Sequence, residues 1–137
     1  MQPFRFHSIY QPRIWGGQSM RTMLGRELPD RETAYGEAWE ISDRPEAMSI
    51  VKDGEWEGMP LHRLWEEHRQ EIFGPGYERF PRFPLLCKIL DARENLSVQV
   101  HPPERTAAAQ QGEVKNEIWY VLHASPDALI YGGMEEN

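Results

Sequence analysis

The segment Leu96-Ser97-Val98-Gln99-Val100-His101 alternates between aliphatic and polar side chains along its whole length. Successive side chains of a β-strand point to opposite faces of a sheet, so the alternation predicts a strand over residues 96–100 with its aliphatic side chains in the core. Ser97, Gln99 and His101 then share the opposite face. That face either meets solvent at an exposed sheet edge or lines a cavity, and the segment by itself favours the exposed edge.

Glu117 adds a carboxylate to this pattern. The segment Glu117-Ile118-Trp119-Tyr120-Val121-Leu122 also alternates and predicts a second strand. If the two strands are neighbours, Glu117 points the same way as Gln99 and His101. An amide oxygen, an imidazole and a carboxylate can bind zinc or another first-row divalent ion. A glutamate at the start of a solvated edge strand fits the same residues, and His123 is a weaker candidate for a further ligand.

The rest of the chain favours short strands over helices. Eleven Gly and eleven Pro separate short apolar runs, a pattern typical of a mainly β domain. Helical spacing predicts one helix over 60–73, between Pro60 and Gly74, and a weaker one over 104–110. Further strands are predicted over residues 4–9, 37–41, 48–52, 83–90 and 128–131. We expect one domain over residues 1–137, with the strands of the metal motif between 83 and 131.

Composition excludes several classes of function. The formal charge is −7, from 15 basic and 22 acidic residues, which disfavours a nucleic-acid binder or a protein that docks on anionic lipid. No apolar run approaches the roughly 20 residues of a membrane helix, and the first residues show no apolar signal segment. Cys87 is the single cysteine and cannot form an internal disulfide. A cytoplasmic domain is expected.

Five stretches of this chain match one known family in the same order. They are Ile14-Trp15-Gly16-Gly17, residues 36–42, residues 83–92, Gln99-Val100-His101-Pro102, and Lys115-Asn116-Glu117-Ile118-Trp119-Tyr120. Together they resemble the class I mannose-6-phosphate isomerases, or phosphomannose isomerases, which are zinc enzymes of the cupin superfamily. The spacing between the stretches is similar to that of the compact bacterial type. The resemblance covers almost the whole chain.

The resemblance implies a fold and a metal site. The fold is a cupin-like jelly-roll, an antiparallel β-sandwich or barrel with one or two short helices. One Zn²⁺ per chain, or another first-row divalent ion, is held by Gln99, His101 and Glu117. In the family, a second histidine ligand and an arginine of the phosphate site lie beyond the position that matches Asn137, the last residue of this sequence. We therefore expect this sequence to match only the N-terminal part of the fold.

The resemblance also implies a reaction, the interconversion of mannose 6-phosphate and fructose 6-phosphate through an enediol. A base must move the proton between two carbons, and the candidate catalytic residues are Lys115 and Lys88. Ser97, Lys88 and Trp15 are the candidate substrate-binding residues. Each of these residues taken singly also fits an ordinary structural or solvated role, and for Lys115 the two interpretations weigh equally.

Two other functions remain open on the sequence alone. One is a cupin module that binds a metal or a sugar phosphate without catalysis, which the absent fourth ligand favours. The other is a purely structural β domain, in which the alternation reflects packing. The expected partner is a small sugar phosphate, with no nucleic acid and no membrane. An unpaired sheet edge also predicts a homodimer.

Overall fold

The computed structural model describes residues 3–110, 112 and 114–133. These residues form two compact units, one that ends at Ser97 and one that begins at Val98. One domain can contain more than one compact unit, so the expectation of a single domain over 1–137 stays a prediction. Among the described residues, no helix has both the length and the apolar character that crossing a membrane requires.

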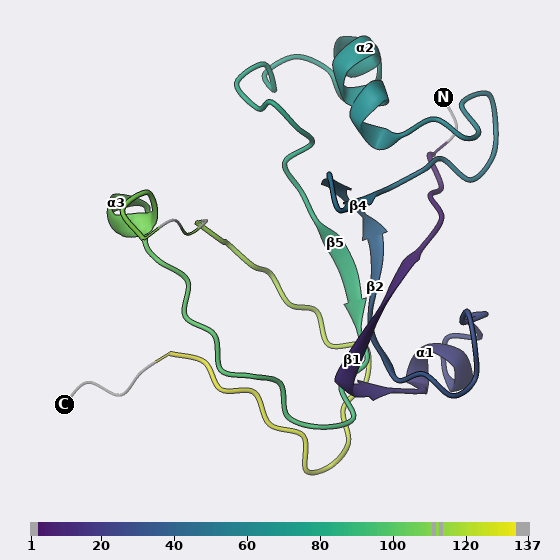
Figure 1. Ribbon diagram of the computed structural model, residues 1–137, viewed down its shortest axis with the longest axis vertical. Coiled ribbons are helices and arrows are strands. Elements are labelled where there is room, and N and C mark those ends of the chain that lie inside the picture. Colours follow the sequence, from purple (N-terminus) through teal and green to yellow (C-terminus); the bar gives the residue numbers. More distant parts are fainter. Residues whose placement is uncertain (1–2, 111, 113, 134–137) are drawn as a thin grey trace. The chain divides into compact units, whose positions relative to one another are not determined.

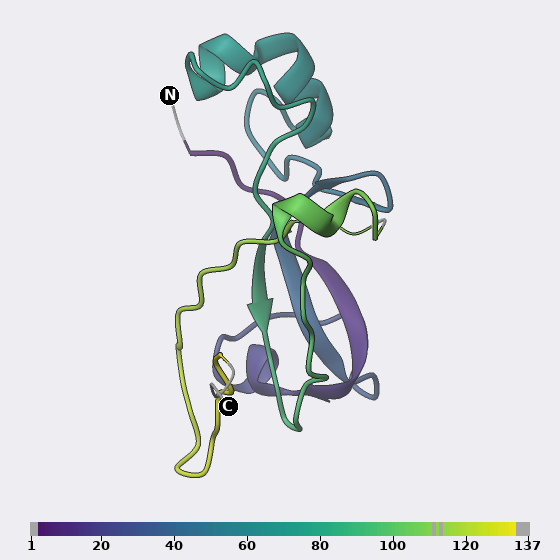
Figure 2. The same cartoon turned by 90° about the vertical axis from the view of Figure 1, so that its left-hand side faces the viewer.

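The first unit is built on a three-stranded antiparallel sheet in the order β1-β2-β5. Its strands are β1 (Ile9–Gly17), β2 (Tyr35–Ile41) and β5 (Cys87–Leu90), which lie side by side in both ribbon views (Figures 1 and 2). A second, two-stranded sheet pairs β3 (Asp43–Arg44) with β4 (Ala47–Met48). The central strand β2 therefore has a neighbour on each side.

One face of the three-stranded sheet is apolar. The register places Ala38 of β2 opposite both Tyr10 and Ile89. Ala38 is fully buried, and Met20 from the short helix α1 (Ser19–Thr22) packs on the same cluster. This face is the core of the sheet, so the side chains that alternate with Ala38 along β2 point to the other face.

The helix predicted over 60–73 is confirmed as α2 (Leu61–Phe73). Pro60 precedes its first turn, and Gly74 ends it with φ = 78°, a left-handed conformation that favours glycine. Leu64 and Trp65 point inward and are buried. In both ribbon views α2 lies beyond the end of the sheet that is opposite to α1 (Figures 1 and 2).

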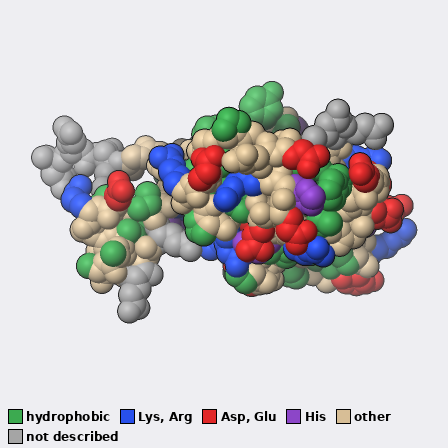
Figure 3. All heavy atoms as spheres, turned by 90° about the horizontal axis from the view of Figure 1, so that it is seen from above, with side chains coloured by type: hydrophobic (Ala, Val, Ile, Leu, Met, Phe, Trp, Pro, Cys, Tyr) green, Lys and Arg blue, Asp and Glu red, His purple; other side chains and the backbone are tan. Residues whose placement is uncertain are grey.

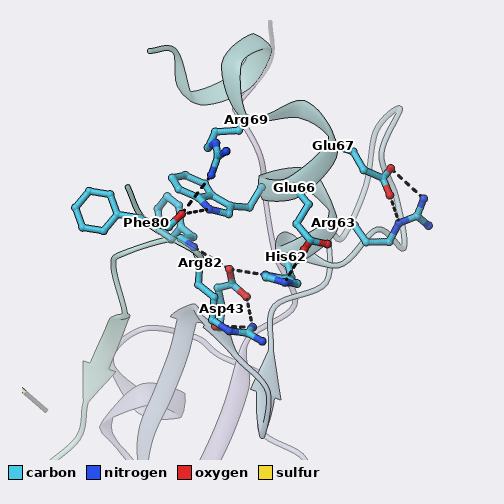
Figure 4. A network of polar contacts seen from close by, with 10 residues as sticks. Asp43, His62, Arg63, Glu66, Glu67, Arg69, Phe80 and Arg82 are labelled. Atoms are coloured by element: carbon cyan, nitrogen blue, oxygen red, sulfur yellow. Dashed lines mark hydrogen bonds and ion pairs between the residues drawn. The ribbon is translucent and has the colours of Figure 1, made fainter. Parts of the chain in front are cut away.

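A buried carboxylate connects α2 to the small sheet. The Asp43 side chain is fully buried and accepts hydrogen bonds from Arg82 Nη1 at 3.0 Å and from the Phe83 backbone N–H at 2.8 Å. His62 Nδ1 in α2 lies 3.1 Å from the same carboxylate. Figure 4 shows these side chains converging on Asp43. One carboxylate therefore joins β3, α2 and the segment that leads to β5.

Some predicted boundaries are wrong in the first unit. The first strand is not 4–9 but β1, which runs on to Gly17. A Cβ at Gly16 would lie 2.6 Å from the Gly36 backbone nitrogen, so glycine lets β1 continue close against β2. The segment predicted as a strand over 48–52 contributes only the end of β4 and isolated bridges.

The predicted strands over 96–100, 117–122 and 128–131 are also wrong, because the described residues after Leu90 contain no strand. In this part of the chain the structure has one short helix, α3 (Glu104–Ala107), which is shorter than the predicted 104–110. Of the aliphatic side chains expected in the core, Val98 is 89% exposed and Val100 is 82% exposed, while Leu96 is half-buried. An alternating segment forms a strand only beside a pairing neighbour, and none of the described residues provides one.

Charges of both signs are interspersed on the surface that Figure 3 shows. On α2 an exposed pair joins Arg63 to Glu67, with Nε and Oε1 2.9 Å apart. This surface therefore shows no large field of a single sign.

Candidate functional site

The second face of the three-stranded sheet carries a charged cluster. The register places Trp39 directly opposite Lys88, and Glu37 lies two residues before Trp39 on the same strand. Glu37 Oε1 accepts a hydrogen bond from Lys88 Nζ at 3.0 Å. Glu37 Oε2 accepts from Arg13 Nη2 at 2.7 Å and from Trp39 Nε1 at 3.0 Å. Each of the three strands thus contributes a side chain to one central carboxylate.

The electrostatics keep Glu37 charged. Burial raises the pKa of this carboxyl, but hydrogen bonds from Trp39 and Lys88 and the charges of Lys88 and Arg13 outweigh burial, so the pKa lies below its usual value. The Glu37 side chain is only 8% exposed, and that of Lys88 is 21% exposed. The cluster is therefore a partly buried set of charges that reaches solvent at Lys88 and at Arg13, whose side chain is 35% exposed.

Gly36 allows β1 to place its side chains against β2. A Cβ at Gly36 would lie 2.6 Å from the Cβ of Arg13 and 2.6 Å from the ring of Trp15. Both side chains occupy space that any other residue at position 36 would fill. Trp15 is half-buried at this point. Its role in binding substrate stays a prediction.

The predicted metal ligands lie in the second unit. Gln99 and Glu117 are exposed and His101 is half-buried. Lys115 Nζ forms an ion pair with Glu117 Oε1 at 3.3 Å, so the structure does pair the predicted base with a predicted ligand. No three His, Cys, Asp or Glu side chains form a metal-binding group in the described part of the chain. The predicted ligand set has only two residues of these types, His101 and Glu117, and its third member is Gln99. A group of three His, Cys, Asp or Glu was therefore not expected, and the metal site stays a prediction.

The structure therefore gives partners to two of the predicted site residues, Lys88 and Lys115. Lys88 is paired with Glu37, which was not among the predicted residues. Ser97 is exposed at the end of the first unit. Sequence reasoning missed Glu37 and Arg13. Alternation along β2 could have identified Glu37, because it shares a face with Trp39, whereas no local pattern marks Arg13 as its partner.

Comparison with known families gives one match over most of the chain. The family described as Phosphomannose isomerase type I, catalytic domain, matches residues 3–125. A mannose-6-phosphate isomerase of Streptococcus mutans is 44% identical over 133 residues, which is 96% of this chain and 40% of the relative. A mannose-6-phosphate isomerase of Bacillus subtilis is 40% identical over 134 residues, which is 96% of this chain and 41% of the relative.

A solved structure also resembles the chain. The crystal structure of the mannose 6-phosphate isomerase from Bacillus subtilis superposes with a TM-score of 0.70 at 36% identity, covering 81% of this chain and 34% of that one. The predicted fold class is confirmed by the antiparallel sheets, the few short helices and this neighbour. The chain spans about 40% of the length of the relatives that it matches.

Proposed function

Because the chain belongs to the type I phosphomannose isomerase family, we propose that the full-length protein interconverts mannose 6-phosphate and fructose 6-phosphate. The observation that supports this proposal most strongly is the extent of the family match, residues 3–125. That range contains every candidate site residue: Trp15, Lys88, Ser97, Gln99, His101, Lys115 and Glu117. We also propose a cytoplasmic location and a small sugar phosphate as the partner.

In this proposal Gln99, His101 and Glu117 hold a divalent metal, with zinc as the first choice. An amide oxygen, an imidazole nitrogen and a carboxylate oxygen are a donor set that zinc accepts. When bound, the cation supplies positive charge that stabilises negative charge on the substrate oxygens. His101 is half-buried and Glu117 is exposed, so a small ion from solvent can reach both side chains.

The chain's own lysines have separate tasks. Aldose–ketose isomerisation through an enediol moves one proton between neighbouring carbons, so it needs a group that accepts the proton and returns it. Lys115 is the candidate for this role, and its ion pair with Glu117 keeps it beside a proposed ligand. Lys88 is the candidate for contacting the substrate, and Ser97 and Trp15 are proposed to contribute further contacts.

A metal-content measurement tests the ligand assignment. His101→Ala and Glu117→Ala are each expected to weaken the zinc affinity of the purified full-length protein by at least about tenfold and so to lower its zinc content, since loss of a direct ligand costs at least as much as loss of an outer-shell partner. Glu94→Ala, which removes an exposed carboxylate near the same segment, is the control and should retain the zinc. His123→Ala tests the weaker ligand candidate. Unchanged zinc in both His101→Ala and Glu117→Ala would remove the assignment.

A coupled assay tests the activity itself. The zinc-loaded full-length protein is expected to form fructose 6-phosphate from mannose 6-phosphate. A protein that binds zinc and sugar phosphate but does not convert one sugar into the other would instead be the non-catalytic module. That result would overturn the proposed function and leave the metal site in place.

A further inference from the structure

The cluster of Arg13, Glu37 and Lys88 has one more positive than negative charge. A lysine paired with a glutamate alone would be neutral. Here Glu37 Oε2 accepts from Arg13 and Oε1 accepts from Lys88, so each cation has its own oxygen. The lowered pKa of Glu37 keeps the carboxylate charged at neutral pH. The formal charge of the cluster is therefore +1.

Lys88 has hydrogen-bonding capacity to spare. An ammonium group has three N–H donors, and Glu37 Oε1 accepts one of them. The Lys88 side chain is partly exposed, whereas Glu37 is almost completely buried. An anion that arrives from solvent therefore meets Lys88 or Arg13, whose side chain is 35% exposed, before it meets the carboxylate. Because the cluster is partly buried, its charge is screened less than that of a fully exposed lysine.

We propose that Glu37 is a positioning residue that holds Lys88 as a charged ligand for an oxyanion of the substrate, and that Arg13 supplies the surplus charge. The inference rests on the proposed function, because an isomerase of sugar phosphates handles two oxyanions, the phosphate and the oxygen of the enediolate. Lys88 is thus a substrate-binding residue in this inference.

Titration with inorganic phosphate tests the surplus charge without using activity. If Lys88 binds the phosphate, Arg13→Met in the metal-stripped full-length protein is expected to raise the Kd for phosphate about tenfold, which corresponds to about 1.4 kcal/mol. Arg13→Lys keeps the charge and should restore most of the affinity. The matched control is Arg5→Met, which removes the same charge from an exposed ion pair with Asp53. The control is expected to shift the Kd by less than about twofold.

Steady-state kinetics distinguish the two oxyanions. If Lys88 binds the phosphate, Arg13→Met raises KM together with the phosphate Kd and leaves kcat nearly unchanged. If Lys88 binds the enediolate oxygen, Arg13→Met lowers kcat and leaves KM and the phosphate Kd unchanged. Both results support the inference. Equal behaviour of Arg13→Met and Arg5→Met in the titration and in the kinetics would overturn it.

Glu37→Gln tests positioning separately from charge. This variant raises the formal charge of the cluster to +2, so charge alone predicts tighter phosphate binding. Positioning predicts weaker binding and a lower kcat/KM, because the ammonium loses the anion that fixes it. Tighter phosphate binding without a loss of kcat/KM would overturn the positioning role. A wild-type protein without isomerase activity would overturn the proposed function alone, since the titration does not depend on turnover.

Discussion

At the scale of single residues, one hydrogen bond between two side chains raises the pKa of a tyrosine. Tyr35 Oη donates to Asp30 Oδ2 at 2.8 Å. This hydrogen bond, with burial and the negative charge of Asp30, raises the pKa of Tyr35 above its usual value. The folded protein therefore gains stability below the ordinary tyrosine pKa and loses that gain as the pH rises through the raised one.

Asp30→Ala is expected to return the pKa of Tyr35 toward its usual value, because the acceptor and its charge are both removed. Ultraviolet absorbance of tyrosinate across an alkaline titration measures the change. Tyr35→Phe is the control, because the part of the wild-type curve that this variant lacks belongs to Tyr35. Superimposable curves for the wild type and Asp30→Ala would contradict the expectation.

The charged cluster shows what sequence can say about a site at this scale. Lys88 was predicted as a site residue through a family resemblance, and the structure adds the contacts that hold it. Glu37 lies on the same face of the sheet as Trp39, which alternation predicts. Arg13, which lies on β1, joins them from 24 positions before Glu37 in the chain. That pairing depends on sheet register, which residue types do not encode locally.

At the scale of elements, Asp43 is the strongest candidate for a structural tether. Its carboxylate connects Arg82, the Phe83 N–H and His62 of α2. Asp43→Ala is expected to lower the free energy of unfolding by about 2 kcal/mol, because the partly buried partners of Asp43 lose their acceptor while Arg82, which is 42% exposed, stays solvated. Urea denaturation followed by circular dichroism measures the change.

The exposed pair on α2 supplies the control for this tether. Glu67→Ala removes a carboxylate from Arg63, with both side chains largely in solvent. The expected loss of stability is within about 0.5 kcal/mol, because exposed ion pairs contribute little. Figure 4 shows both carboxylates, one beneath α2 and one on its outer side. Equal losses in the two variants would argue against a tether at Asp43.

Elements with local signals were predicted better than those that need a distant partner. The helix α2 follows from helical spacing between Pro60 and Gly74, all of which lies within one short segment. The alternation in residues 96–101 is equally clear, yet the structure has no strand there. Alternation shows which side chains would share a face, but a strand also needs backbone partners. Those partners cannot be read from the segment itself.

At the scale of the whole molecule, the described residues leave a run of large apolar side chains uncovered. Ile118 is 100% exposed and Tyr120 is 87% exposed, with Leu122 two residues further on. Exposed apolar patches of this kind mark surfaces that another surface covers or that drive association. The 137-residue chain is therefore expected to self-associate as its concentration rises, in line with the homodimer predicted from an unpaired edge.

Sedimentation velocity over a range of concentrations measures this association. Ile118→Lys combined with Tyr120→Lys is expected to shift the distribution toward the monomer, because two charges in the run oppose its burial. Gln110→Lys adds a charge at an exposed polar position and should leave the distribution unchanged. If the chain were monomeric at every concentration, the exposed run would not be an association surface. If the double variant associated as strongly as the wild type, the association would have to arise elsewhere, and the sheet edge at β5 would be the next surface to test.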